Sequence, residues 1–166
     1  MSTRTIKAIR RLQGQPTLSK DKEENMSGPG VPVGGLRTVG QIMATNPLRF
    51  YAGQNGLAIA IALLSTHTAG APVVDGKSKY LGFINEYDVM KVLESGKNMN
   101  KLTAEDIMRK DRIVVSGSTP ITKAYKIMEE HRVLNLPVEN NGKVVCSVSR
   151  HDLLRAWIGL GPQIED

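Results

Sequence analysis

Two segments of the chain carry apolar residues at the period of an α-helix. In the later segment the apolar stripe consists of Ile121, Ala124, Tyr125 and Met128. This spacing predicts a helix that packs one face against a sheet. Ser118 and Thr119 are suitable caps for it, and Pro120 suits its first turn. The earlier segment, residues 56–66, is predicted to form the matching helix.

Short runs of β-branched and aromatic residues, bounded by Gly, Pro, Asn and Asp, predict strands. These runs cover residues 48–51, 71–74 and 80–84 in the first half of the chain, and 112–116, 134–139 and 143–148 in the second. Shorter helical segments are expected at 39–43, 87–93, 102–108 and 152–158. Asn140, Asn141 and Gly142 predict a hairpin turn. Each half therefore follows the order β-α-β-β-α.

The two halves also correspond residue by residue. An offset of 65 aligns Thr38 with Thr103, Met43 with Met108, and Ala71-Pro72-Val73 with Leu136-Pro137-Val138. One residue is lost in the next turn, and an offset of 64 then aligns Asp88 with Asp152. A long period that occurs twice indicates a duplicated unit. We therefore expect a two-lobed α+β fold with pseudo-twofold symmetry and a cleft between the lobes.

The sequence suggests four regions. Residues 28–35 are so rich in Gly and Pro that they are predicted to be a linker rather than a helix or a central strand. We expect a basic N-terminal tail with this linker (1–36), a first repeat (37–96), a second repeat (97–160) and a C-terminal tail (161–166).

The composition is that of a globular protein. The longest uncharged apolar stretch, residues 57–64, is far shorter than the ~20 residues that cross a bilayer, so no membrane span is expected. Cys146 is the single cysteine and cannot form an intramolecular disulfide, so we expect a small buried side chain. A reducing compartment, by default the cytoplasm, is the predicted location.

The N-terminal tail carries half of the net charge of +6, with six lysines and arginines against three acids in residues 1–36. Ile6, Ile9 and Leu12 recur at intervals of three, which is compatible with a short basic amphipathic helix. Three interpretations remain open: a soluble tail without fixed structure, a docking segment for an acidic protein or nucleic acid, and a cleavable organelle presequence.

This ordered set of elements, present twice in register, resembles a cystathionine β-synthase (CBS) domain pair over residues 37–160. The resemblance is carried by the Ile-Met turns at 42–43 and 107–108, the Pro-Val strands at 72–73 and 137–138, and an aspartate at each strand-to-helix step. It implies two small sheets packed around a pseudo-twofold axis, with two equivalent clefts. It also implies an adenine-containing ligand, such as AMP, ADP, ATP or S-adenosylmethionine, and disc-shaped homodimers.

In this family the strand-to-helix step reads Gly-x-x-Thr/Ser-x-x-Asp, and the hydroxyl and carboxylate face the cleft. The second repeat has Ser149 and Asp152 at these positions, and the first has Asn85 and Asp88. An aspartate in the first turn of a helix can accept both hydroxyls of a ribose, and the backbone N–H groups beside it suit an anion. The alternative is that each pair only forms a capping box.

By the family's geometry, each cleft joins the pair of one repeat with the Thr and Met of the other repeat's leading turn. Site A would combine Ser149 and Asp152 with Thr38 and Met43. Site B would combine Asn85 and Asp88 with Thr103 and Met108. We expect site B to be weaker because an asparagine replaces the hydroxyl. Methionines at such positions are more often core residues than adenine contacts.

Cations near the cleft mouth would hold a phosphate, and the resemblance assigns Arg132, Arg150 and His151 to site A. The alternative for the two arginines is a solvated surface. Some relatives carry a further arginine just before the Pro-Val step, where this chain has Ala71 and Leu136. This difference favours AMP or an adenosyl ligand over a polyphosphate.

The chain has no phosphate loop, no nucleophile elbow and no metal-ligand spacing among its histidines and cysteine, so an enzyme is not expected. The sequence instead predicts a stand-alone sensor, suited to energy sensing, that binds an adenine ligand and modulates an unidentified protein. The main alternative is a ligand-free dimeric platform whose basic tail docks to an acidic protein or nucleic acid. A divalent-cation sensor is a third possibility.

Overall fold

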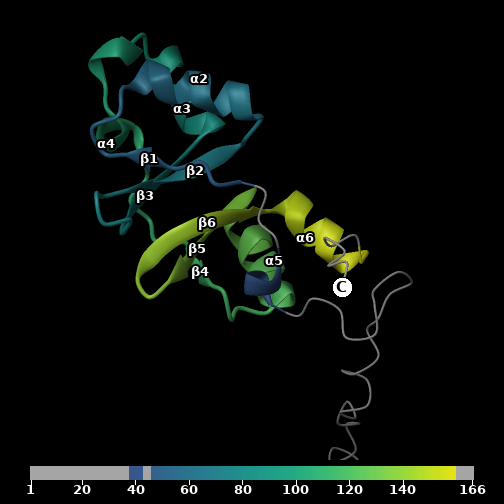
Figure 1. Ribbon diagram of the computed structural model, residues 1–166. Coiled ribbons are helices and arrows are strands. Elements are labelled where there is room, and N and C mark those ends of the chain that lie inside the picture. Colours follow the sequence, from purple (N-terminus) through teal and green to yellow (C-terminus); the bar gives the residue numbers. More distant parts are fainter. Residues whose placement is uncertain (1–37, 43–45, 160–166) are drawn as a thin grey trace, which may run out of the picture.

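The computed structural model describes residues 38–42 and 46–159, which form two lobes (Figure 1). The first lobe contains β1 (Phe50–Tyr51), α2 (Gly56–Thr66), β2 (Gly70–Val74), β3 (Tyr80–Asn85) and α3 (Glu86–Glu94). The second contains β4 (Val115–Ser116), α5 (Ile121–His131), β5 (Asn135–Asn140), β6 (Lys143–Ser149) and α6 (Arg150–Trp157). The remaining helices are short: η2 (Val39–Gln41), η3 (Met99–Lys101) and α4 (Ala104–Ile107).

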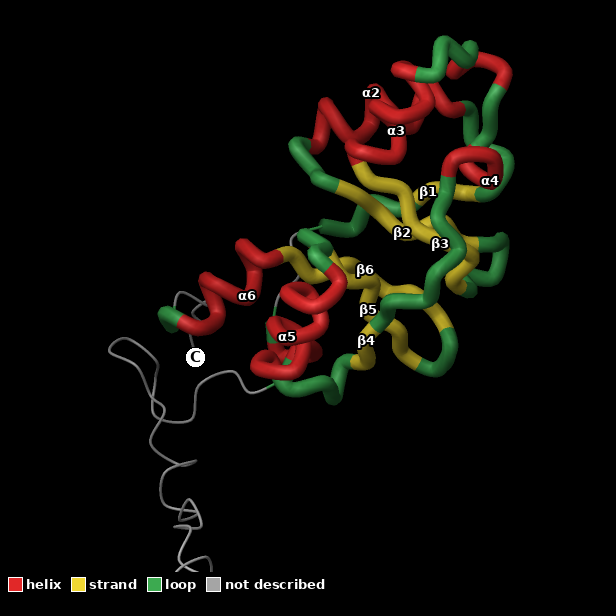
Figure 2. Tube along the Cα trace, turned by 180° about the vertical axis from the view of Figure 1, so that it is seen from behind, coloured by secondary structure: helices red, strands yellow, loops and turns green. Residues whose placement is uncertain are grey.

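Each lobe holds one three-stranded sheet, and the two sheets have the same topology. The order is β1-β2-β3 in the first sheet, where β1 is parallel and β3 antiparallel to β2. The second sheet repeats this arrangement as β4-β5-β6. The sheets face each other in the middle of the molecule, with α2 and α3 outside the first and α5 outside the second (Figures 1 and 2). The predicted two-lobed α+β fold is confirmed.

The offsets found in the sequence hold in three dimensions. Glu86 and Arg150, which are 64 residues apart, each begin the last helix of their lobe. The N–H of Glu86 donates to the carbonyl of Ala69 at 3.1 Å, and the N–H of Arg150 donates to the carbonyl of Leu134 at 3.0 Å. Equivalent positions of the two repeats can therefore be compared directly.

The leading segment of each repeat packs on the opposite lobe. The N–H of Val39 in η2 donates to the carbonyl of Thr119 at 2.8 Å, and its side chain lies in the core of the second lobe. The N–H of Ala104 in α4 donates to the carbonyl of Gln54 at 2.8 Å, and its side chain lies in the core of the first lobe. This exchange ties the two lobes together along the seam between the sheets.

The first long helix of each lobe ends at a residue in the left-handed conformation. His67 ends α2 with φ 49°, and Arg132 ends α5 with φ 52°. Glycine is the usual residue at such a helix end, because a side chain adds steric strain. The left-handed caps turn the chain into β2 and β5, and they bring both side chains to the seam.

Some local predictions are wrong, and others fall outside the described residues. Pro120, rather than Ser118 or Thr119, occupies the N-cap position of α5, and it makes no side-chain cap hydrogen bond. The hydroxyl of Thr119 instead accepts the N–H of Ser116 at 3.1 Å and so closes the preceding turn. Cys146 is half-buried rather than buried. Met43 and the two tails lie outside the described residues. Within the part of the chain that the structure describes, no helix is both long and apolar enough to span a bilayer.

Candidate functional site

A hollow of about 390 Å³ opens at the seam, and we name it hollow A. The first lobe contributes residues 66–69, where α2 ends and β2 approaches. The second lobe contributes the beginnings of β5 and α6. Its polar lining includes Asn46, His67, Asn135, Ser149, Arg150 and His151. Small-molecule sites usually have volumes of about 300–1,000 Å³, so hollow A is large enough for a small ligand.

Ser149 and Asp152 form a capping box at the N-terminus of α6, as the sequence suggested. The N–H and the hydroxyl of Ser149 both donate to Oδ2 of Asp152 at 2.8 Å. The N–H of Asp152 donates in return to Oγ of Ser149 at 3.1 Å. Ser149 lines hollow A, whereas Asp152 is only 2% exposed and is not among the lining residues. A ligand hydroxyl that enters from the hollow therefore meets Ser149 first.

Cationic and titratable nitrogen groups surround hollow A. Arg150 and His151 are exposed in the first turn of α6, and His67 reaches the hollow from the end of α2. Among the described residues that line hollow A, none is acidic. The N-terminal end of α6 adds a partial positive charge. The hollow is therefore suited to an anionic group.

A second hollow of about 360 Å³, hollow B, lies at the equivalent place across the pseudo-twofold axis. Its lining contains the counterparts of the hollow A residues, namely Asn85 for Ser149, Glu86 for Arg150, Tyr87 for His151 and Arg132 for His67. Phe83 and Met90 add apolar surface. Glu86 brings a negative charge to the helix start that carries an arginine in hollow A. Hollow B is therefore less suited to an anion.

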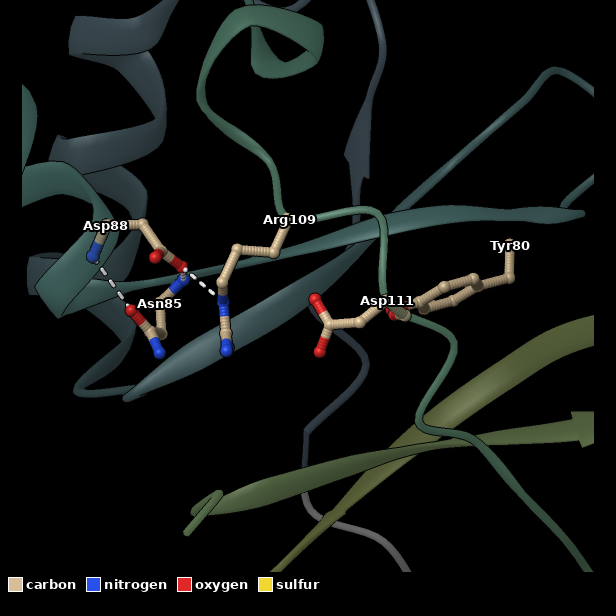
Figure 3. Close-up of polar contacts among 5 residues, drawn as sticks. All are labelled: Tyr80, Asn85, Asp88, Arg109 and Asp111. Atoms are coloured by element: carbon tan, nitrogen blue, oxygen red, sulfur yellow. Dashed lines mark hydrogen bonds and ion pairs between the residues drawn. The ribbon is translucent and has the colours of Figure 1, made fainter. Parts of the chain in front are cut away.

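The first-turn aspartate beside hollow B is already paired with a cation. Asp88 is 7% exposed, and its Oδ2 accepts the N–H of Asn85 at 3.0 Å and the Nε–H of Arg109 at 3.2 Å. Figure 3 shows the guanidinium of Arg109 lying next to Asp88 and Asn85. The backbone of Arg109 pairs with Phe83 through two hydrogen bonds of 2.9 Å.

The seam beside Arg109 is nearly closed. The gap lined by Tyr80, Phe83, Asp111 and Pro137 amounts to only about 10 Å³. The hydroxyl of Tyr80 donates to the carbonyl of Asp111 at 2.9 Å, and the two residues lie side by side in Figure 3. Burial, followed by the charge of Asp111, raises the pKa of Tyr80 to about 12, so the phenol is neutral at physiological pH. This part of the seam has no room for a purine.

The structure brings together part of each predicted site. Ser149, Arg150 and His151 line hollow A, and Asn85 lines hollow B. Arg132 had been grouped with site A but lines hollow B, because it ends α5 on the other side of the pseudo-twofold axis. Its counterpart at hollow A is His67, which the sequence interpretation missed, although the offset of 65 would have found it.

Thr38, Thr103 and Met108 line neither hollow. Thr38 pairs with Pro120 at the start of α5, and Thr103 pairs with Asn55 at the start of α2. Met108 packs against the core of the first lobe. These three residues therefore hold the leading segment of each repeat against the opposite lobe. The resemblance to the family had instead suggested that they contact a ligand.

Asn135 was also missed, and it lines both hollows. Its side chain is buried, and its Nδ2 donates to the carbonyl of Gly70 at 2.8 Å. Asn135 and Gly70 are equivalent residues of the two repeats, so this hydrogen bond crosses the pseudo-twofold axis. No local sequence pattern marks it, because its two residues are 65 positions apart and meet only in the folded molecule.

The described residues form neither a metal site nor a reactive cysteine at the seam. Among them, no group of three or more His, Cys, Asp or Glu side chains could hold a metal ion. Burial, and then the charge of Asp152, raise the pKa of the Cys146 thiol, and Arg49 opposes them. A raised pKa lowers the thiolate fraction and with it the reactivity of this cysteine.

A family comparison explains the duplicated fold. The sequence model of the CBS domain matches residues 39–95 and again residues 104–159. An uncharacterized protein of Methanopyrus kandleri is 28% identical over 131 residues, which is 78% of this chain and 67% of that protein. The chain spans only 26% of another relative, an L-aspartate semialdehyde sulfurtransferase of Methanocaldococcus jannaschii.

Solved structures share the fold. CBSX2 in complex with AMP superposes with a TM-score of 0.66 at 23% identity, over 75% of this chain and 98% of that chain. The CBS domain pair of the protein MJ0100, in complex with 5′-methylthioadenosine and S-adenosylmethionine, gives a TM-score of 0.64 at 25% identity. That match covers 74% of this chain and 97% of the MJ0100 chain.

Proposed function

Because this chain belongs to the CBS domain family and carries two such domains in tandem, we propose that it is a non-catalytic regulatory module that binds an adenine nucleotide in hollow A. AMP is the favoured ligand. Binding would change how the module is recognised by a separate protein, so the output is a change in affinity rather than a chemical reaction.

The observation that carries this proposal is the chemistry of hollow A. A hydroxyl at Ser149 and the groups of His67, Arg150 and His151 surround a space of about 390 Å³ between two lobes. The hydroxyl can bind a ribose oxygen, and Arg150, the imidazole N–H groups and the α6 N-terminus can bind a phosphate. A nucleoside monophosphate combines both groups in one small ligand.

Two relatives support the adenine part of the ligand. CBSX2 holds AMP, and MJ0100 holds 5′-methylthioadenosine and S-adenosylmethionine. We favour AMP over ADP and ATP because the positions before the Pro-Val steps are Ala71 and Leu136, which add no further cation. Favouring AMP over the adenosyl compounds follows from the cationic lining of hollow A.

A ligand in hollow A would contact both lobes, because residues 66–69 and 149–151 come from opposite sides of the seam. It can act as a signal only if it binds one arrangement of the module more tightly than another. We propose that the nucleotide stabilises the present seam, and that the partner protein distinguishes the stabilised module from the empty one.

One observation favours a second candidate function, the ligand-free dimeric platform. Large apolar side chains are exposed on the outer helices of both lobes, and they include Leu57, Ile61, Leu64, Tyr87, Met90, Leu93, Tyr125, Leu154 and Trp157. Exposed apolar surface of this kind marks an interaction site. A platform would use this surface without any ligand, so a ligand-binding measurement decides between the two functions.

Thermal denaturation with AMP, ADP, ATP, S-adenosylmethionine and NADH tests the proposal. A ligand at a hundredfold excess over its Kd stabilises the native protein by about 2.7 kcal/mol. For a chain of this size that corresponds to a rise in Tm of about 5–10 °C. We expect the largest rise with AMP.

Arg150→Ala should raise the Kd for AMP about tenfold or more, since a hydrogen bond to a charged group contributes about 1.5–3 kcal/mol. Arg155→Ala is the matched control, because it removes the same charge from an exposed position of the same helix outside hollow A. An unchanged Tm with all five ligands would rule out the proposal and favour the platform. An equal loss of affinity in both variants would place the ligand elsewhere.

A further inference from the structure

Two of the three histidines in the chain line hollow A, and they reach it from opposite lobes. His67 ends α2 in the first lobe, and His151 lies in the first turn of α6 in the second. His131, the third histidine, is the exposed last residue of α5 and lines neither hollow. Histidine is the side chain type whose ordinary pKa, about 6.5, lies closest to physiological pH. Hollow A therefore contains groups that can exchange protons in this range.

The described side chains that line hollow A beside the two imidazoles are basic or neutral. Arg150 precedes His151 in the first turn of α6, and Arg155 lies one turn further along the same helix. The remaining lining residues are Asn46, the neighbours of His67 in 66–69, residues 134–135 and Ser149, and none of them titrates near neutral pH. Residues 43–45, which precede Asn46, contain no ionisable side chain.

Two carboxylates lie near hollow A without lining it. Asp152 follows His151 in α6, is 2% exposed, and accepts the N–H and the hydroxyl of Ser149. The N–H of Glu86 donates to the carbonyl of Ala69, a residue of both hollows, but Glu86 itself lines hollow B. Among the described residues, no carboxylate therefore lines hollow A to pair with a protonated imidazole.

A phosphate in hollow A would supply the opposite charge that its described lining lacks. It attracts an imidazolium and accepts a charge-assisted hydrogen bond from it, which is roughly twice as strong as the bond from a neutral imidazole. Coupling between two ligands is reciprocal, so an anion that favours protonation is itself bound more tightly by the protonated form. Arginine keeps its charge at every physiological pH, so Arg150 cannot provide such a dependence.

We propose that protons bind hollow A together with AMP: His67 and His151 take up protons when the phosphate enters, and the affinity for AMP rises as the pH falls from 8.5 to 6.5. This inference rests on the proposed function of hollow A. A phosphate monoester has a second pKa of about 6 and becomes a monoanion below it, so the affinity should peak near that pH. The module then responds to acidification as well as to the nucleotide.

Isothermal titration calorimetry at pH 7, repeated in buffers of different ionisation enthalpy, counts the protons taken up with each AMP. We expect an uptake of about 0.5 proton or more, because histidines of ordinary pKa are mostly neutral at pH 7. Binding of the AMP dianion can only release protons from the nucleotide, so a net uptake comes from the protein. Adenosine lacks the phosphate and should bind without uptake. Between pH 6.5 and 8.5 the Kd for AMP should rise about five- to tenfold.

Substitution of both histidines tests their assignment. His67→Asn and His151→Gln remove the titrating groups but keep amide N–H donors, and asparagine tolerates the left-handed backbone at position 67. The double variant should take up no proton, and its Kd for AMP should stay nearly constant from pH 6.5 to 8.5. Each single variant should lose about half of the uptake. His131→Gln is the matched control and should take up as many protons as the wild-type protein.

Three results would overturn the inference: AMP binding by the wild-type protein without proton uptake, uptake that persists in the double variant, and an equal loss of uptake in His131→Gln. If the double variant binds AMP too weakly to measure, the single variants decide, and full uptake in both of them contradicts the assignment. No AMP binding by the wild-type protein at any pH from 6 to 8.5 would instead refute the proposed function.

Discussion

At the level of single residues, the helices α2 and α5 both end at a residue in the left-handed backbone conformation. His67 and Arg132 occupy equivalent positions with φ 49° and 52°, where a side chain costs roughly 1–2 kcal/mol. Strain of this kind accumulates where a side chain is needed for function. His67 lines hollow A and Arg132 lines hollow B, so both strained residues bring a nitrogen group to the seam.

We predict that His67→Gly raises the free energy of unfolding by about 1 kcal/mol and weakens AMP binding several-fold. The gain comes from relief of the left-handed strain, and the loss comes from removal of a group that lines hollow A, where we propose that the phosphate binds. Chemical denaturation and AMP titration measure the two effects. Arg132→Gly is the control: it should give a similar gain in stability with no loss of AMP affinity, and an equal loss in both variants would contradict the assignment of His67.

The sequence predicted only those site residues that lie on a recognisable motif. Ser149, Arg150 and His151 were found because they follow a strand and begin a helix. His67 required the offset of 65 to be applied to Arg132, and it was therefore missed. Arg109 could not be predicted, because its ion pair with Asp88 depends on how closely the chain approaches Gly82.

At the scale of elements, the chain predicts the long helices better than the short segments. Helix α2 has the predicted bounds, Gly56–Thr66, and Asn55 caps it by accepting the N–H groups of Leu57 and Ala58. Strands β1 and β4 are shorter than predicted, at two residues each. Both are edge strands paired on one side only, and the extent of that pairing depends on the neighbouring strand rather than on local sequence.

The leading segments of the two repeats, which pack on the opposite lobes, show a second limit of what local sequence patterns can predict. Short helical segments at 39–43 and 102–108 were expected from the sequence, and η2 and α4 form there with Thr38 and Thr103 at their N-cap positions. Their position against the opposite lobe depends on tertiary packing, which a local sequence pattern does not predict. It explains why Thr38 and Thr103 hold the lobes together instead of lining the hollows.

At the scale of the whole molecule, the exposed apolar side chains of the outer helices indicate association. Leu64 on α2 is 71% exposed, and Ile61 on the same helix is 54% exposed. Tyr125 and Trp157 from α5 and α6 stack edge to face, with ring centroids 5.7 Å apart, and both are partly exposed. We propose that these helices form the interface of a homodimer.

Sedimentation velocity should show a dimer for the wild-type protein at micromolar concentration. Leu64→Glu should give a monomer, because it places a charge in an apolar interface. Ser65→Glu changes the neighbouring exposed residue, and it serves as the control that should remain dimeric if the effect is specific to the apolar face. A monomeric wild-type protein would contradict the proposed interface.

The seam itself connects the two hollows. Asn135 lines both of them and bonds across the pseudo-twofold axis to Gly70. A ligand in hollow A would therefore contact a side chain that also borders hollow B.

The proposed function requires that an adenine nucleotide binds at the seam in hollow A. Titration of ¹⁵N-labelled protein with AMP, followed by amide chemical shifts, tests it most directly. We expect the largest changes at residues 67–69, 134–135 and 149–151, which line hollow A from both lobes. Absence of any change, or changes confined to Asn85, Glu86, Tyr87 and Arg132 around hollow B, would contradict it.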